Sequence, residues 1–189
     1  MRIILTTLLF VGASSMTNLS AELSESSTFS TQPAVNITPR FVKTGFIRQS
    51  SRMVDTIVLH SSYNSLGGNV YELENLIAIF RHYGVSSHYV INRDGNIYQL
   101  VQDNNISYHA GISQMPDGRK SVNRFSIGIE LMNTRQDQYT EAQYESLQKL
   151  IVFLKTRHPI KNIVGHGQIA PQRRNDPWNL NWSRINVTN

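Results

Sequence analysis

Five short runs of β-branched and apolar residues, interleaved with two amphipathic helical patterns, restrict this chain to few architectures. The runs are 54–60, 88–92, 97–101, 126–132 and 160–164. Between the second and third runs, Asp94 and Gly95 form a pair that favours a hairpin turn. Most of the runs are apolar at successive positions, which indicates strands buried on both faces. Such a sheet must be covered by helices, so the pattern predicts an α/β layer fold.

The two helical patterns are well delimited. Apolar residues recur with the period of a helix over 73–80, and Gly84 stands where glycine commonly follows a helix. The second pattern covers 140–157. It opens with Thr140 and Gln143, which have the spacing of a capping box. These helices supply the apolar faces that the predicted sheet needs.

The first residues have the pattern of a secretory signal peptide, which we expect over 1–21. Arg2 is followed by an apolar run over 3–13 and then by small residues, with candidate cleavage sites after residues 13–15 or after Ala21. The apolar run is shorter than the ~20 residues of a membrane span. We therefore expect a periplasmic or secreted protein with no stable membrane anchor once the signal is removed.

Residues 22–50 are rich in Ser and Thr and show no period, so we expect a flexible lead-in before one domain over 51–189.

The 189 residues contain no cysteine, which excludes disulfides, cysteine metal ligands and a cysteine nucleophile. The net charge of +5 favours acidic partners. No run of five basic residues marks a nucleic-acid arm, so no nucleic-acid partner is predicted. The oligomeric state is not readable from the sequence.

Three ionisable residues interrupt the apolar pattern. His60 ends the first run, Glu130 lies inside the fourth, and His166 follows the fifth. Burying such a group is costly unless it is paired or bound to a metal. The alternatives are an ordinary buried or surface role for each histidine, and a Glu130 that faces water from an edge strand. Gly128 shares the face of Glu130, and its lack of a side chain predicts room for a ligand there.

Asp176, in a loop after the fifth run, would complete a metal site. Two histidines and one carboxylate form a catalytic zinc set that leaves the fourth position open for water. Residue chemistry alone does not choose among the six histidines. His88 and His109 are rivals as ligands. His82 and His158 lie on the predicted helices, where surface roles are expected.

Five motifs occur in an order that resembles a known family. They are 56–60, 87–95, 108–111, 123–131 and 164–177. Together they look like the type 2 N-acetylmuramoyl-L-alanine amidases, whose superfamily includes phage amidase lysozymes and peptidoglycan recognition proteins. The resemblance covers about 53–182 and is nearest to small exported bacterial amidases without a separate wall-binding domain.

The resemblance implies a zinc enzyme. The implied fold is a central mixed β-sheet flanked by helices, with Zn²⁺ at the floor of a groove. The implied metal ligands are His60, His166 and Asp176; the catalytic residues are Glu130 and Arg174; and the predicted substrate-binding residues are His88, His109 and Asn133.

The implied reaction is hydrolysis of the amide between N-acetylmuramic acid and L-alanine in peptidoglycan or muropeptides. Zinc would activate water, with Glu130 as general base, and zinc and Arg174 would stabilise the oxyanion. Stem peptides carry free carboxylates, which suits the basic chain. The alternatives are a non-catalytic peptidoglycan-binding module on the same fold and a zinc peptidase that cuts within the stem peptide.

Three features depart from the family pattern. Arg174 stands where many members have Lys, and an arginine can hold an oxyanion but cannot readily give up a proton. The stretch 114–118 lacks the Trp that often follows the His-Ala-Gly motif, and Trp178 stands where many members have Gly. The last two changes lie near the implied groove, so we expect them to affect which muropeptides fit.

Overall fold

The structure is a computed structural model that describes residues 34–185. One six-stranded sheet forms its centre. In spatial order its strands are β1 (Ile37–Pro39), β5 (Ile97–Gln99), β4 (Tyr89–Ile91), β7 (Ser126–Met132), β3 (Thr56–Ser62) and β8 (Asn162–Gly165). Neighbouring strands are parallel except for β4 and β5. The predicted mixed α/β sheet is confirmed.

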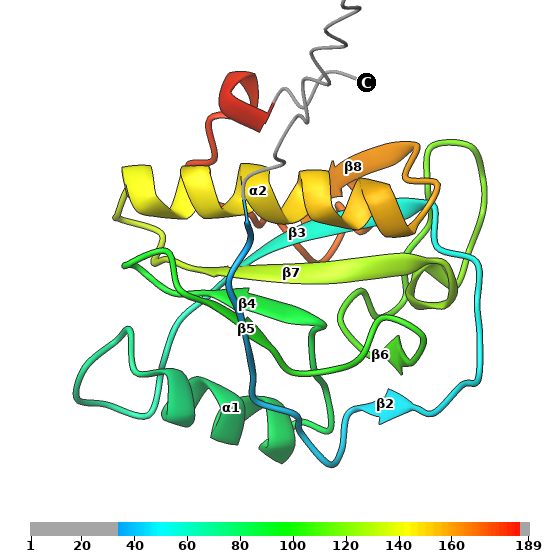
Figure 1. The fold of residues 1–189 in the computed structure, drawn as a ribbon. Coiled ribbons are helices and arrows are strands. Elements are labelled where there is room, and N and C mark those ends of the chain that lie inside the picture. The colour runs from blue at the N-terminus through cyan, green and yellow to red at the C-terminus, as the bar shows by residue number, and fades with distance from the viewer. Residues whose placement is uncertain (1–33, 186–189) are drawn as a thin grey trace, which may run out of the picture. The chain divides into compact units, whose positions relative to one another are not determined.

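Helices lie on both sides of this sheet (Figure 1). The helical segments are α1 (Leu73–His82), α2 (Glu141–Arg157), the short α3 (His166–Ile169) and two 3-10 turns, η1 (Val122–Arg124) and η2 (Trp182–Ile185). A small antiparallel pair, β2 (Phe46–Ile47) with β6 (Ile106–Ser107), completes the fold. Within residues 34–185, no helix is both long enough and apolar enough to cross a membrane.

The alternation of side chains along β7 divides the molecule into layers. Ile127, Ile129 and Leu131 are fully buried in the core cluster that also holds the apolar face of α2. Gly128 and Glu130 point to the opposite side. β3 is divided in the same way, since Ile57 and Leu59 join the α2 cluster whereas Val58 joins a cluster on the other face. One face of the central strands is therefore apolar core, and the other carries the polar residues that the sequence singled out.

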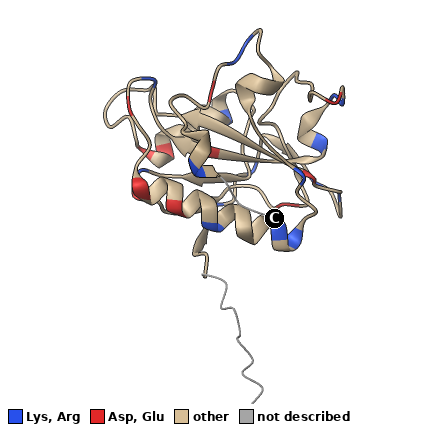
Figure 2. Cartoon of the chain, turned by 90° about the horizontal axis from the view of Figure 1, so that it is seen from above, with Lys and Arg blue, Asp and Glu red and all other residues tan. Residues whose placement is uncertain are grey.

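The predicted start of the second helix is confirmed. The Thr140 hydroxyl accepts from the Gln143 N–H, and the Gln143 side chain accepts from the Thr140 N–H. Gln143 also donates to the carbonyl of Met132 at 2.9 Å, which joins the helix start to the end of β7. Acidic residues lie toward the start of α2 and basic ones toward its end, as the helix dipole favours (Figure 2).

The hairpin and the end of the first helix also follow the sequence pattern. β4 and β5 pair antiparallel across residues 92–96, and Gly95 takes a φ of +82° that suits glycine. Gly84, after α1, has a φ of +63°. The strand ends differ from the predicted runs by at most two residues, and β3 continues to Ser62, so that His60 lies inside the strand.

The ordered fold begins earlier than the sequence pattern suggests. Part of the expected lead-in is built into the fold, because β1 pairs with β5 and β2 pairs with β6. These segments have two or three residues and pair with β5 and with β6 through backbone hydrogen bonds, which require no side-chain period. The expected signal peptide and the first part of the lead-in lie outside the described residues.

Candidate metal centre and catalytic site

The three predicted metal ligands lie together at the carboxyl ends of β3 and β8. His60 is in β3, His166 begins α3 directly after β8, and Asp176 lies in the loop that follows α3. The Asp176 Oδ2 is 3.5 Å from the His60 Nδ1 and 3.3 Å from the His166 Nδ1. One ligand atom from each residue lies within 4.8 Å of the others, and all three side chains are buried. β3 and β8 are parallel neighbours, which explains why residues 106 positions apart meet here.

A directional chain of hydrogen bonds orients His60. The hydroxyl of Ser126 donates to the carbonyl of Val122 at 2.7 Å, so its oxygen accepts from the Nε2–H of His109 at 3.2 Å. The Nδ1 of His109 is then an acceptor, and the Nε2–H of His60 donates to it at 3.0 Å. This order leaves the Nδ1 lone pair of His60 facing Asp176.

His166 is oriented in a similar way by a backbone carbonyl. Its Nε2 lies 3.1 Å from the oxygen of Ala110, which can only accept, so Nε2 carries the proton and Nδ1 faces Asp176. The Ala110 carbonyl also accepts from Arg173 at 2.8 Å, and Arg173 donates to the Ile112 carbonyl. Arg173 therefore holds the loop that positions His166.

The electrostatics of the three residues favour a bound cation. Burial lowers the pKa of His60 to about 4, a change that Asp176 only partly opposes, so His60 is neutral near pH 7. Imidazole lone pairs and a carboxylate oxygen converge, with the far nitrogens of both rings already bonded. This donor set fits Zn²⁺.

Glu130 lies beside this centre as the direct register partner of His60, on the adjacent strand β7. Its side chain is buried, and burial together with the charge of Asp176 raises its pKa to about 8, although Arg174 opposes this. A carboxyl group whose pKa lies near neutrality can both take and release a proton at physiological pH. The position and the pKa of Glu130 suit a general base.

Arg174 is exposed at the same edge, two residues before Asp176. Its positive charge lowers the pKa of both His60 and Glu130, so it acts on the centre electrostatically. The structure therefore brings together all five residues predicted as metal ligands or catalytic groups: His60, His166, Asp176, Glu130 and Arg174.

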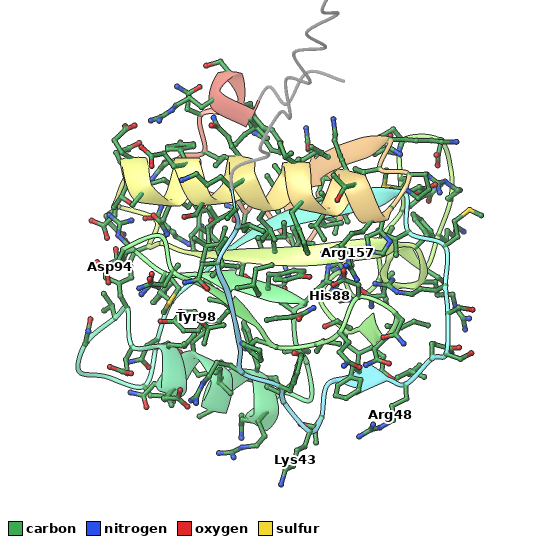
Figure 3. The ribbon with its side chains drawn as sticks, viewed as in Figure 1. Lys43, Arg48, His88, Asp94, Tyr98 and Arg157 are labelled. Carbon is green, nitrogen blue, oxygen red and sulfur yellow. The ribbon has the colours of Figure 1, made fainter. Side chains whose placement is uncertain are left out.

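Two of the predicted substrate-binding residues do not open on this site. His88 is fully buried, and its Nδ1 accepts from the Gly128 N–H at 3.0 Å (Figure 3). Asn133 is also fully buried; it accepts from Arg93 and donates to the Asp137 carbonyl. Both side chains therefore use their hydrogen bonds to hold neighbouring segments of the protein together.

His109 lies at the site, but its ring nitrogens are both used within the protein. Its ring also fills the space that the sequence predicted for a ligand beside Gly128. A Cβ at Gly128 would lie 2.4 Å from the Cγ of His109. The missing side chain therefore makes room for this histidine, and the prediction of a ligand there is wrong.

The sequence reasoning missed the part played by Ser126. The alternation along β7 places Ser126 on the face of Gly128 and Glu130, so a buried polar residue on the site face was visible in the pattern. Its partner, His109, lies 17 residues earlier in the chain, and no local spacing connects the two.

Comparison with known proteins matches this geometry to a family. The family model described as N-acetylmuramoyl-L-alanine amidase matches residues 50–179. The 1,6-anhydro-N-acetylmuramyl-L-alanine amidase AmpD of Citrobacter freundii is 44% identical over 107 residues, which are 55% of this chain and 57% of that protein. The chain thus matches little more than half the length of this curated relative.

Solved structures support the same relationship. A selenomethionine derivative of AmpD superposes with a TM-score of 0.66 and 34% identity, covering 78% of this chain and 92% of that one. The amidase AmiD from E. coli, solved with anhydro-N-acetylmuramic acid-L-Ala-D-γ-Glu-L-Lys, gives a TM-score of 0.62 and 26% identity, covering 75% of this chain and 64% of that one. With the family model matching more than half of its residues, the chain belongs to the N-acetylmuramoyl-L-alanine amidase family.

Proposed function

We propose that this protein is a zinc-dependent amidase that hydrolyses the bond between N-acetylmuramic acid and L-alanine in peptidoglycan or muropeptides. The observation that carries the proposal is the convergence of His60, His166 and Asp176 with Glu130 beside them. A relative named as an amidase of this bond is 44% identical over the matched region. Family membership alone would not distinguish an enzyme from a binding protein, so this set of side chains is what supports an enzyme.

The three ligand residues would hold a single zinc ion. Such an ion supplies Lewis acidity, which polarises the amide carbonyl and lowers the pKa of a water molecule. The hydrogen bonds from His60 to His109 and from His166 to Ala110 keep the Nδ1 atoms turned inward for this purpose. The chain therefore presents the centre in a preorganised form.

Glu130 would move the proton. Its carboxylate takes a proton from the attacking water and delivers it to the nitrogen of L-alanine as the amide C–N bond breaks. The positive charge of zinc would favour the ionised form of Glu130 at the start of this step. Because a guanidinium does not readily give up a proton, Arg174 would serve as a fixed positive charge near the developing oxyanion and not as the acid.

The substrate class follows from the relatives. AmiD from E. coli was solved with a muramyl peptide, and the Citrobacter freundii protein is named for the 1,6-anhydro form. We propose muramyl peptides as the substrates. The predicted signal over residues 1–21 would place the reaction in the periplasm or outside the cell.

The alternative, a non-catalytic peptidoglycan-binding module, leaves two features without a purpose. A binding surface does not need a buried Glu130 with a raised pKa, nor a donor set whose far nitrogens are fixed. Replacing such groups by apolar residues would stabilise a pure binder.

Digestion of a defined muropeptide tests the proposal. The purified chain is incubated with N-acetylmuramyl-L-Ala-D-γ-Glu-L-Lys, with and without a chelator, and the products are weighed by mass spectrometry. We expect free N-acetylmuramic acid and a peptide with a free L-alanine amine, loss of both with the chelator, and recovery with added zinc. Cleavage within the peptide would identify a peptidase, and binding without cleavage would identify the non-catalytic module.

A further inference from the structure

A tryptophan next to the candidate metal centre is held in a fixed position. Trp178 follows Asp176 by two residues, and its backbone N–H donates to the Ser61 hydroxyl, beside His60, at 2.9 Å. Its indole N–H donates to the side chain of Asn175 at 2.9 Å. These bonds attach the indole to both segments that supply metal ligands.

Arg135 lies over this indole. Its guanidinium carbon is 4.7 Å from the centroid of the Trp178 ring, within the range of a cation–π contact. The backbone is held as well, because Asn179 donates to the Arg135 carbonyl at 2.9 Å. The positive charge is thus kept at one place beside the centre.

The guanidinium of Arg135 has no carboxylate partner among residues 34–185. Within that range its side chain also donates no hydrogen bond, and Arg135 is exposed. The nearest acidic residue along the chain, Asp137, accepts from Tyr71 and Thr134. A guanidinium stacked on an aromatic ring keeps its N–H edge free, and that edge matches the two oxygens of a carboxylate.

We propose that Arg135, stacked on Trp178, binds a carboxylate of the stem peptide and so helps to select the substrate. The inference rests on the proposed function. In a muramyl-L-Ala-D-γ-Glu substrate, the glutamate is linked through its γ-carboxyl, so its α-carboxylate is free. That group lies about two residues from the scissile amide, or roughly 7 Å along an extended chain.

Three synthetic substrates test the proposal and separate the possible carboxylates. The first is N-acetylmuramyl-L-Ala-D-γ-Glu-L-Lys with both carboxylates free. The second carries D-isoglutamine, which replaces the α-carboxylate by a carboxamide. The third keeps the α-carboxylate and carries a carboxamide at its C-terminus. Steady-state kinetics are measured for the wild type, Arg135→Gln and Trp178→Gly.

We expect Arg135→Gln to raise KM for the first and third substrates about fivefold, as loss of a partly exposed ion pair does, with kcat unchanged. KM for the D-isoglutamine substrate should not change. Trp178→Gly should have the same selective effect, because Arg135 loses the surface on which it stacks. Arg48→Gln is the matched control, since Arg48 is also exposed and stacked, on Phe46 at 5.9 Å, and projects from the β2 side of the molecule (Figure 3).

Each outcome decides a different point. Equal KM values for wild type and Arg135→Gln on all three substrates overturn this inference and leave the amidase proposal intact. A rise in KM for the first and second substrates but not for the third supports carboxylate binding but assigns it to the peptide terminus. A wild type that cleaves none of the three refutes the proposed function, and this inference with it. Thermal unfolding of each variant shows whether Trp178→Gly has altered folding. If it has, the KM values of Arg135→Gln, which changes only a surface residue, decide whether the inference holds.

Discussion

The Nε2 atom of His60 donates a hydrogen bond to the Nδ1 atom of His109 over 3.0 Å, and this contact determines which nitrogen of His60 faces Asp176. His109 is itself oriented by Ser126. It is therefore a positioning residue, which acts on the centre through His60 and does not need to touch the substrate.

Replacing His109 by Phe should weaken zinc binding about 10–100-fold, as loss of such an outer contact commonly does. Phenylalanine keeps the ring but offers no acceptor, so the buried N–H of His60 loses its partner. Competition with a chromophoric chelator measures the affinity. His82→Phe is the control, because His82 is exposed on α1. Equal zinc affinities in the two variants would contradict the positioning role.

Gly128→Ala should disturb the same contact from the other side. The new methyl group would lie 2.4 Å from the Cγ of His109, so the ring must move. We expect a loss of about 1–3 kcal/mol in the free energy of unfolding, together with weaker zinc binding. In the double variant with His109→Ala the methyl group has space, so the double variant should be more stable than the sum of the single effects predicts. Strict additivity would show that the two residues do not interact.

Glu130→Gln should lower kcat by a factor of about 10²–10⁴ and leave zinc affinity nearly unchanged. The carboxamide keeps the shape of the side chain but cannot take a proton from water. Hydrolysis of a muropeptide and chelator competition are measured on the same preparation. Full activity in this variant would reject Glu130 as the base.

At position 174 the charge should matter more than the chemical identity. Arg174→Gln should lower kcat about 10²–10³-fold through loss of oxyanion stabilisation, whereas Arg174→Lys should keep most of the activity. The two variants differ in charge and are similar in length, so their ratio isolates the electrostatic contribution. If glutamine served as well as lysine, Arg174 would have no part in the reaction.

The metal-free protein should lose stability as the pH is lowered below 6.5. Burial lowers the pKa of His60 to about 4, that of His88 to about 3, and that of His109 well below its usual value. Between pH 6.5 and these lowered values, each takes up a proton in the unfolded chain but not in the folded protein. Glu130 acts oppositely, because its pKa of about 8 lets the folded protein hold a proton that the unfolded chain releases above pH 4.5.

Three such histidines against one glutamate leave a net difference of about two protons, so the slope approaches roughly 3 kcal/mol per pH unit near pH 5. Urea unfolding in the presence of a chelator, at pH 7, 6 and 5, measures it. A stability that stays constant or rises on acidification would contradict the burial of these neutral histidines.

Local patterns predicted the parts of the fold that depend on local physics. The run 126–132 is β7 with the same bounds, and the capping box of Thr140 and Gln143 marks the true start of α2. The period of two along β7 also placed Glu130 on the face opposite Ile127 and Ile129. In each case the determining contacts lie within a few residues of one another in the chain.

Contacts between distant segments were beyond these patterns. β1 and β2 carry no periodic pattern; β1 pairs with β5 at the edge of the main sheet, and β2 pairs with β6 in a separate two-stranded sheet. The hydrogen bond between His60 and His109 joins residues 49 apart in the sequence, and no local sequence pattern near either histidine predicts it. His88 similarly resembles a site residue until the structure places it against the backbone of Gly128.

The direct pairing of His60 with Glu130 across β3 and β7 limits how the sequences of these two strands can change. Successive side chains of a strand alternate between its two faces. Inserting or deleting one residue upstream in either strand would therefore turn the side chain of His60 or Glu130 into the apolar core beneath α2. Evolution is thereby confined to conservative exchanges within these two strands. Changes in substrate specificity are expected in the connecting loops, whose length can vary without shifting the register of the paired residues.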